Sequence, residues 1–162
     1  MCFAAEFATT PADTYRVCSD GTAATASAGP TGTTLFVTSE YTLSVTGGTV
    51  AGDGSVTGVS STSMSNGVAG IAISGTTAFV TNYYGDSVTQ CTIDGTSLTG
   101  CATTGSNFSG PFGIAISGTT AFVTNAVGSV TQCTIDGTSL TDCTDLTGAT
   151  FSAPNGIAIN GA

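Results

Sequence analysis

The sequence has almost no positive charge. It contains no histidine and no lysine, and its one arginine is Arg16, whereas ten acidic side chains give a net charge of −9 at pH 7. Binding to a phosphate backbone or to an anionic membrane surface requires several lysine or arginine side chains. The composition therefore predicts no nucleic-acid partner and no attraction to a charged membrane.

The absence of histidine excludes whole classes of chemistry. No Ser–His or Cys–His nucleophile can form, and a frequent zinc ligand is missing. Two carboxylates could still act as acid and base, but Asp53, Asp94 and Asp136 adjoin glycines in turn signals, where aspartate is the ordinary residue. We expect no catalytic residues, no cofactor and no metal. Calcium held by turn oxygens is the alternative, although no run of the DxDxDG kind occurs.

Long hydrophobic runs are also missing. No apolar stretch approaches the roughly 20 residues of a transmembrane helix, so we expect no membrane insertion. The apolar fraction of 40% is nevertheless too high for a disordered Ser/Thr tract, and 162 residues are enough to bury a core as one domain.

The chain is dominated by a repeat. The string GIAISGTTAFVTN occurs at residues 70–82 and again at 113–125, and SVTQCTIDGTSLT follows at 87–99 and 129–141. The period is 43 residues, and GIAIN starts a third round at Gly156. A period of about 40 residues in a β-forming pattern is typical of propeller blades.

Each repeat contains four short β-forming runs separated by glycine turns. In the first exact copy they are GIAIS, TTAFVTN, SVTQCTI and SLTGCATT. The prediction is a single all-β domain of propeller-like blades, each with four antiparallel strands. Its expected parts are an irregular partial blade at 1–26, blades at 27–69, 70–112 and 113–155, and the first strand of a further blade at 156–162.

The six cysteines indicate disulfides. Two pairs share one spacing, and an earlier, diverged copy of the repeat has Gly48 and Val59 at the two corresponding positions. Both cysteines of that copy are therefore missing together, as a bridge predicts. An even cysteine count with repeated spacing points to an oxidising compartment, extracellular or at the cell surface, whereas a metal site would need CxxC motifs or histidine. The expected bridges are Cys91–Cys101, Cys133–Cys143 and, by elimination, Cys2–Cys18.

The cysteine spacing also predicts a hairpin. If Cys91 faces Cys101, then Asp94 faces Leu98, and Gly95–Ser97 forms a three-residue loop. Closing a loop of about ten residues would contribute roughly 2–3 kcal/mol on the chain-entropy account.

Two loops carry candidate contact residues. Glu40 and Asp86 follow the second strand of their repeats, where propellers often build sites, although solvated loop acids are the alternative. Tyr83 and Tyr84 stand where the sister repeat has an Ala-Val pair. Paired aromatic side chains suit a carbohydrate or protein ligand, and packing against a neighbouring blade is the other interpretation.

The repeat pattern PxGIAIxGTTAFVTNxxxxSVTxCxIDGxxLxxC resembles NHL-type and lactonase-like β-propeller proteins, especially bacterial forms with a cysteine pair in each blade. The resemblance covers Gly32–Ala162. It implies a closed ring of six or seven blades, in a superfamily that includes lactonases, sugar hydrolases, binding scaffolds and surface proteins. Its lactonase-like members use histidine, arginine or metal-binding acids near the central channel.

The repeat arithmetic suggests self-assembly. Ile157 and Ile159 correspond to Ile71 and Ile73, which we expect to be buried, so a lone first strand would expose apolar side chains and an unpaired edge. Pairing with the segment 1–25 of another copy would give a homo-oligomer or filament. We expect an extracellular structural or interaction protein. The alternatives are four-bladed closure within one chain, a truncated longer propeller, and a fragment of a lactonase-like hydrolase.

Overall fold

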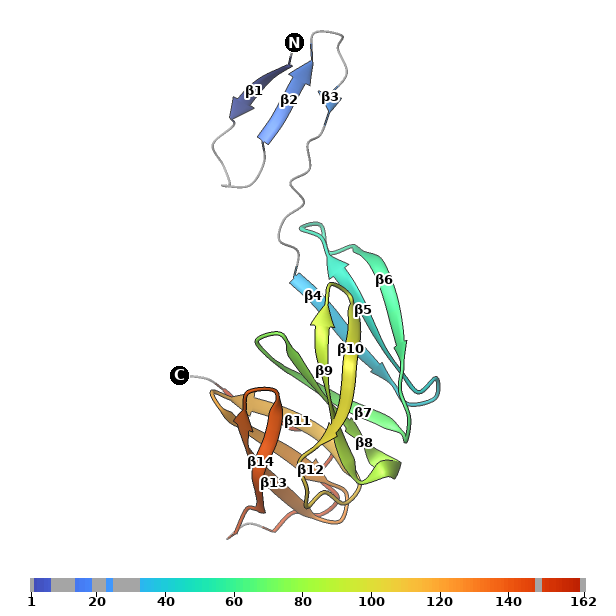
Figure 1. Ribbon diagram of the computed structural model, residues 1–162, viewed down its shortest axis with the longest axis vertical. Coiled ribbons are helices and arrows are strands. Elements are labelled where there is room, and N and C mark those ends of the chain that lie inside the picture. The colour runs from blue at the N-terminus through green and yellow to red at the C-terminus, as the bar shows by residue number, and fades with distance from the viewer. Residues whose placement is uncertain (1, 7–13, 19–22, 25–32, 148–149, 161–162) are drawn as a thin grey trace.

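The structure is a computed structural model that describes residues 2–6, 14–18, 23–24, 33–147 and 150–160, with side chains from Thr33 onward. Within these ranges the regular elements are β-strands, apart from one short 3-10 helix, η1 (Tyr83–Gly85). The strands form four antiparallel sheets, and each sheet contains strands that are consecutive in the chain (Figure 1). The predicted all-β fold of propeller-like blades is therefore confirmed.

Each sheet corresponds to one round of the repeat. Consecutive strands pair side by side, as in a propeller blade. The N-terminal sheet contains β1 (Cys2–Glu6), β2 (Thr14–Cys18) and β3 (Ala23–Ala24); blade A contains β4 (Thr33–Ser39), β5 (Ser44–Val50) and β6 (Val56–Ser63). Blade B contains β7 (Val68–Ser74), β8 (Thr77–Asn82), β9 (Ser87–Asp94) and β10 (Ser97–Thr104); blade C contains β11 (Pro111–Ser117), β12 (Thr120–Asn125), β13 (Ser129–Asp136) and β14 (Ser139–Asp145).

The hydrophobic core lies between neighbouring blades. Phe79 of blade B is fully buried in one cluster with Val123 and other side chains of blade C. A second cluster joins Val80 of blade B to Val45 of blade A, with Phe36 packed against it. Side chains alternate between the two faces of a strand, so β8 contributes Phe79 to one cluster and Val80 to the other.

The first strands of blades B and C approach the following segment closely. A Cβ atom on Gly70 would lie 2.5 Å from the carbonyl oxygen of Phe112, and one on Gly113 would lie 2.4 Å from that of Asn155. No side chain fits at either position without movement of the backbone. Gly70 and Gly113 are therefore required by this close approach.

The expected three-residue hairpin loop is wrong. Asp94 pairs with Ser97 and not with Leu98, which leaves a two-residue turn, Gly95-Thr96. Gly95 has φ +59°, the value that a type II′ turn requires at its first central residue, and this turn matches the twist of the strands. A β-bulge between Thr99 and Ala102 then restores the pairing of the cysteines.

Two further expectations concern blade boundaries. The start of the blade expected at 27–69, residues 27–32, lies outside the described residues. Of the first strand expected at 156–162, residues 156–160 are not in a β-strand and pair with none in the described part of the chain, and residues 161–162 are not described. These residues nevertheless follow blade C as β11 follows blade B, since Thr124 donates a hydrogen bond to the carbonyl oxygen of Asn155.

Candidate functional site

Each complete blade carries a disulfide across its outer hairpin. The structure contains the bridges Cys91–Cys101 and Cys133–Cys143, each with its Cα atoms 4.1 Å apart. Both lie at the bulge, where two residues of the fourth strand face one residue of the third. The bridges indicate a compartment that permits disulfides, outside the reducing cytoplasm.

The third expected bridge falls on residues whose side chains are not described. The backbone register of β1 and β2 places Cys2 directly opposite Cys18. In blade A, the corresponding residues are Gly48 and Val59, and Val59 is 63% exposed. Blade A therefore has no bridge at this position.

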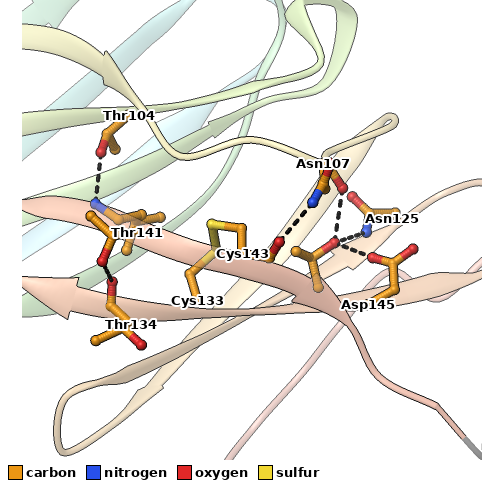
Figure 2. The surroundings of a disulfide bond; sticks show 10 residues. Thr104, Asn107, Asn125, Cys133, Thr134, Thr141, Cys143 and Asp145 are labelled. Carbon is orange, nitrogen blue, oxygen red and sulfur yellow. Dashed lines mark hydrogen bonds between the residues drawn. A yellow bond between two sulfur atoms is a disulfide. The ribbon is translucent and has the colours of Figure 1, made fainter.

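A partly buried polar network lies beside the blade C bridge (Figure 2). The side-chain amide of Asn125 donates to Thr131, and the Thr131 hydroxyl lies within hydrogen-bonding distance of Asp145 and of the carbonyl oxygen of Asn107. The Asn107 amide in turn donates to the carbonyl oxygen of Cys143 at 2.6 Å. This network fixes the loop between blades B and C onto blade C.

A threonine in the second strand of every blade ties that blade to the next. We call Thr38, Thr81 and Thr124 the clamp threonines. Their hydroxyls donate to the carbonyl oxygens of Ala69, Phe112 and Asn155, at 2.7, 2.7 and 3.0 Å respectively. Thr81 and Thr124 also accept hydrogen bonds from the backbone N–H groups of Gly70 and Gly113.

The clamp threonines were missed in the sequence analysis. A signal for them existed, because the sequence F-V-T occurs in all three blades at a constant period. A threonine inside an otherwise apolar, buried run needs a hydrogen-bond partner. For Thr38 and Thr81, the hydrogen-bond partner of the hydroxyl lies in the next blade.

Some of the predicted contact residues, which come from two loops, lie next to one another in the structure. The Tyr84 hydroxyl donates to the Glu40 carboxylate at 3.4 Å, and the negative charge of Glu40 raises the pKa of Tyr84. The rings of Tyr83 and Tyr84 meet edge to face at 5.0 Å, and Tyr83 also contacts Phe112. Tyr84 is 71% exposed and Tyr41, beside Glu40, is fully exposed.

Tyr83 and Asp86 have structural partners. Tyr83 packs on the first strand of blade C, as the packing interpretation predicted. Asp86 accepts a hydrogen bond from the Gly110 backbone N–H at 2.6 Å and adopts a left-handed conformation with φ +45°. Of the predicted contact residues, Glu40, Tyr84 and Asp86 are exposed, and Tyr41 is exposed beside Glu40.

The aspartates of the predicted turns, which the structure describes, do not form a cluster that could bind a metal ion. The Ser55 hydroxyl and backbone N–H both donate to Asp53 and hold the pKa of its carboxyl below the usual value. Within the described residues, no group of three or more His, Cys, Asp or Glu side chains could hold a metal ion. Asp53 therefore has the role of a turn residue.

The two outer faces of the blade stack are uncovered. Seven of the twelve exposed large apolar side chains in the described chain lie on the outward face of blade A or beside that of blade C. Phe122, the counterpart of the fully buried Phe79, borders an open groove with Ser117, Thr120, Ile157, Ala158 and Ile159. The seven residues are Leu35, Val37, Val56 and Val59 in blade A, and Leu146, Phe151 and Ile159 at blade C.

Among the described residues, no helix is long and apolar enough to cross a membrane. No known protein family and no curated protein matches the sequence.

Solved structures do resemble the chain. Hydrazine synthase of Kuenenia stuttgartiensis matches 76% of this chain and 34% of its own, with 22% identity and a TM-score of 0.58. A protein assigned as a 6-phosphogluconolactonase of Bacteroides uniformis ATCC 8492 matches 67% of this chain and 36% of its own, with 16% identity and a TM-score of 0.54. The chain thus spans about a third of the length of these structures. At these identities the likeness shows the fold alone, which is propeller-like.

Proposed function

We propose that this chain is an extracellular structural module that assembles with further copies of itself. The observation that carries the proposal is the pair of uncovered apolar faces on blades A and C. Between blades A and B, and between blades B and C, the equivalent faces are fully covered: Ala78, Val80 and Phe79 are all 0% exposed. An exposed apolar face of this kind marks an interaction surface.

The two faces are complementary and not identical. Blade C presents Phe122, which corresponds to the phenylalanine that each blade directs toward the next. Blade A presents Leu35 and Val37, which correspond to the residues of blade B that receive Phe36. Joining two different faces is a head-to-tail contact, which gives a ring if the rotation closes and a filament if it does not.

The disulfides fit a structural role outside the cell. Each links the third and fourth strands of its blade, and both restrict the unfolded chain. The exposed residues Tyr41, Tyr84 and Glu40 would offer such an assembly a surface for a carbohydrate or protein ligand. A fragment of a lactonase-like hydrolase is the rival function.

The test is light scattering on the purified chain over a range of concentrations. We expect species larger than the monomer, and Phe122→Asp should weaken assembly by about 10- to 100-fold because it removes a large apolar side chain from the contact. Tyr41→Asp, a fully exposed position away from both faces, is the matched control and should assemble normally.

Three results would overturn the proposal. One is a monomer at every concentration. Another is an intact mass of the native protein that shows further blades in the same chain, which would cover these faces instead. The third is turnover of lactones or esters with an added divalent metal that a chelator abolishes.

A further inference from the structure

Residues 156–160 occupy the place of a first strand without its partners. Thr124 binds the carbonyl oxygen of Asn155 as Thr81 binds that of Phe112, so the segment continues the series of first strands. The carbonyl oxygen of Asn155 lies against Gly113 as the carbonyl oxygen of Phe112 lies against Gly70. Beside Ile157 and Ile159 the groove at Phe122 is open, in the position where a second strand would lie.

The N-terminal sheet has the opposite deficiency. Its register places Phe3 opposite Val17 and Cys2 opposite Cys18. In blade B, Phe79 lies opposite Gln90 and Ala78 opposite Cys91. The sequences CFAAE and AFVTN thus occupy the same register, with a phenylalanine second in each. β1, β2 and β3 therefore correspond to the second, third and fourth strands of a blade, and β1 lies at the open edge of their sheet.

We infer that β1 of one copy pairs with residues 156–160 of a second copy, so that the two chains together build one composite blade. This inference rests on the proposed self-assembly and specifies its contact. The register follows from blade B, where Ile71 pairs with Val80, Ala72 with Phe79 and Ile73 with Ala78. The corresponding pairs between copies are Ile157 with Ala4, Ala158 with Phe3, and Ile159 with Cys2.

One composite blade would cover both uncovered faces. Cys2 and Ala4 hold the register positions of Ala78 and Val80, small residues that receive the phenylalanine of the preceding blade. Phe122 of blade C would be received there. On its other side the composite blade would adjoin blade A, because β3 directly precedes blade A in the chain.

A second copy suits this arrangement better than closure within one chain. Figure 1 shows β1, β2 and β3 beyond blade A, whereas blade C lies at the other end of the series of sheets. Within the described residues, β1 pairs only with β2. The clamp position in β1 is Ala5, so this joint would lack one of the hydrogen bonds found inside the chain.

The experiment is a cross-strand disulfide in the full chain. Ala4→Cys with Ile157→Cys places two thiols directly opposite each other, at a Cβ separation that needs little adjustment for bridging. Ala5→Cys with Ile157→Cys is the matched control, because a shift of one residue directs the side chain to the other face. We expect covalent multimers on non-reducing gels for the first pair only, with peptide mapping showing the 4–157 link and an intact Cys91–Cys101 bridge.

The other outcomes separate the inference from the proposed function. Equal cross-linking of both pairs, or none, in a protein that still assembles by light scattering would overturn the register and leave self-assembly standing. A 4–157 bridge inside a monomer would show four-bladed closure within one chain and overturn the inference. No cross-link and no assembly would overturn both.

Discussion

Removal of the Thr81 hydroxyl tests how the blades are joined. Thr81 is completely buried, and its hydroxyl accepts a hydrogen bond from the Gly70 N–H and donates one to the carbonyl oxygen of Phe112, both at 2.7 Å. Thr81→Val keeps the size and the β-branched shape of the side chain. It leaves one backbone donor and one backbone acceptor without their partner where blades B and C lie close together.

The magnitude follows from these two groups. A buried polar group left without a partner costs about 1–3 kcal/mol, so the pair predicts a loss of roughly 2–6 kcal/mol in the free energy of unfolding. For a chain of this size that loss corresponds to a decrease in Tm of about 4–24 °C. The better strand propensity of valine offsets only a few tenths of a kcal/mol.

Thr124→Val is the matched control. Thr124 makes the same two hydrogen bonds, but its acceptor Asn155 is exposed, so water can replace the lost hydroxyl at that carbonyl. We expect about half the loss seen for Thr81→Val, measured by urea unfolding at concentrations where the chain is monomeric. A loss below about 0.5 kcal/mol for Thr81→Val, or an equal loss for the two variants, would refute the clamp.

Three further changes have defined outcomes. Reducing the Cys91–Cys101 and Cys133–Cys143 bridges should lower the free energy of unfolding by about 2–3 kcal/mol each, and unchanged urea midpoints with reductant would contradict this. Asp142→Gly should stabilise the chain by about 0.5–1 kcal/mol, because Asp142 has φ +49° where blades A and B have glycine, and Gly100→Asp should have the opposite effect. Glu40→Gln should lower the pKa of Tyr84, which ultraviolet titration against a Tyr84→Phe reference would detect. Because the folded pKa is raised, the contribution of Tyr84 to stability is complete below its unfolded pKa and is lost as the pH rises through the folded value.

The strand pattern and the disulfide pairing could be read from the sequence because both depend on local spacing. Alternating apolar residues between glycine turns define the strands, and the equal separation of Cys91–Cys101 and Cys133–Cys143 defines the bridges. The loop at Gly95 was predicted incorrectly because the spacing of two cysteines does not show a β-bulge. A bulge adds one residue to one strand, so a two-residue turn and a three-residue loop give the same cysteine separation.

The contacts between blades could not be predicted from the sequence in the same way. Thr81 and Gly70 have their partners 31 and 42 residues away in the chain, and no local pattern shows that these residues meet. The same applies to Tyr83, whose packing on Phe112 depends on how two blades are stacked. The contact of Tyr84 with Glu40 was not predicted either, and it arises because loops after corresponding strands of blades A and B lie side by side.

The positions at which the repeats differ are more informative about function than the positions at which they agree. Where the copies agree, as at Thr38, Thr81, Phe36 and Phe79, the residue joins one blade to the next. Where blade A differs, it exposes Leu35 and Val59 on its outward face, in place of Ala78 and Cys101 of blade B. Larger apolar side chains on an outward face are costly in an isolated module and favourable in a covered one. Assembly with a further blade, as proposed above, would cover these side chains.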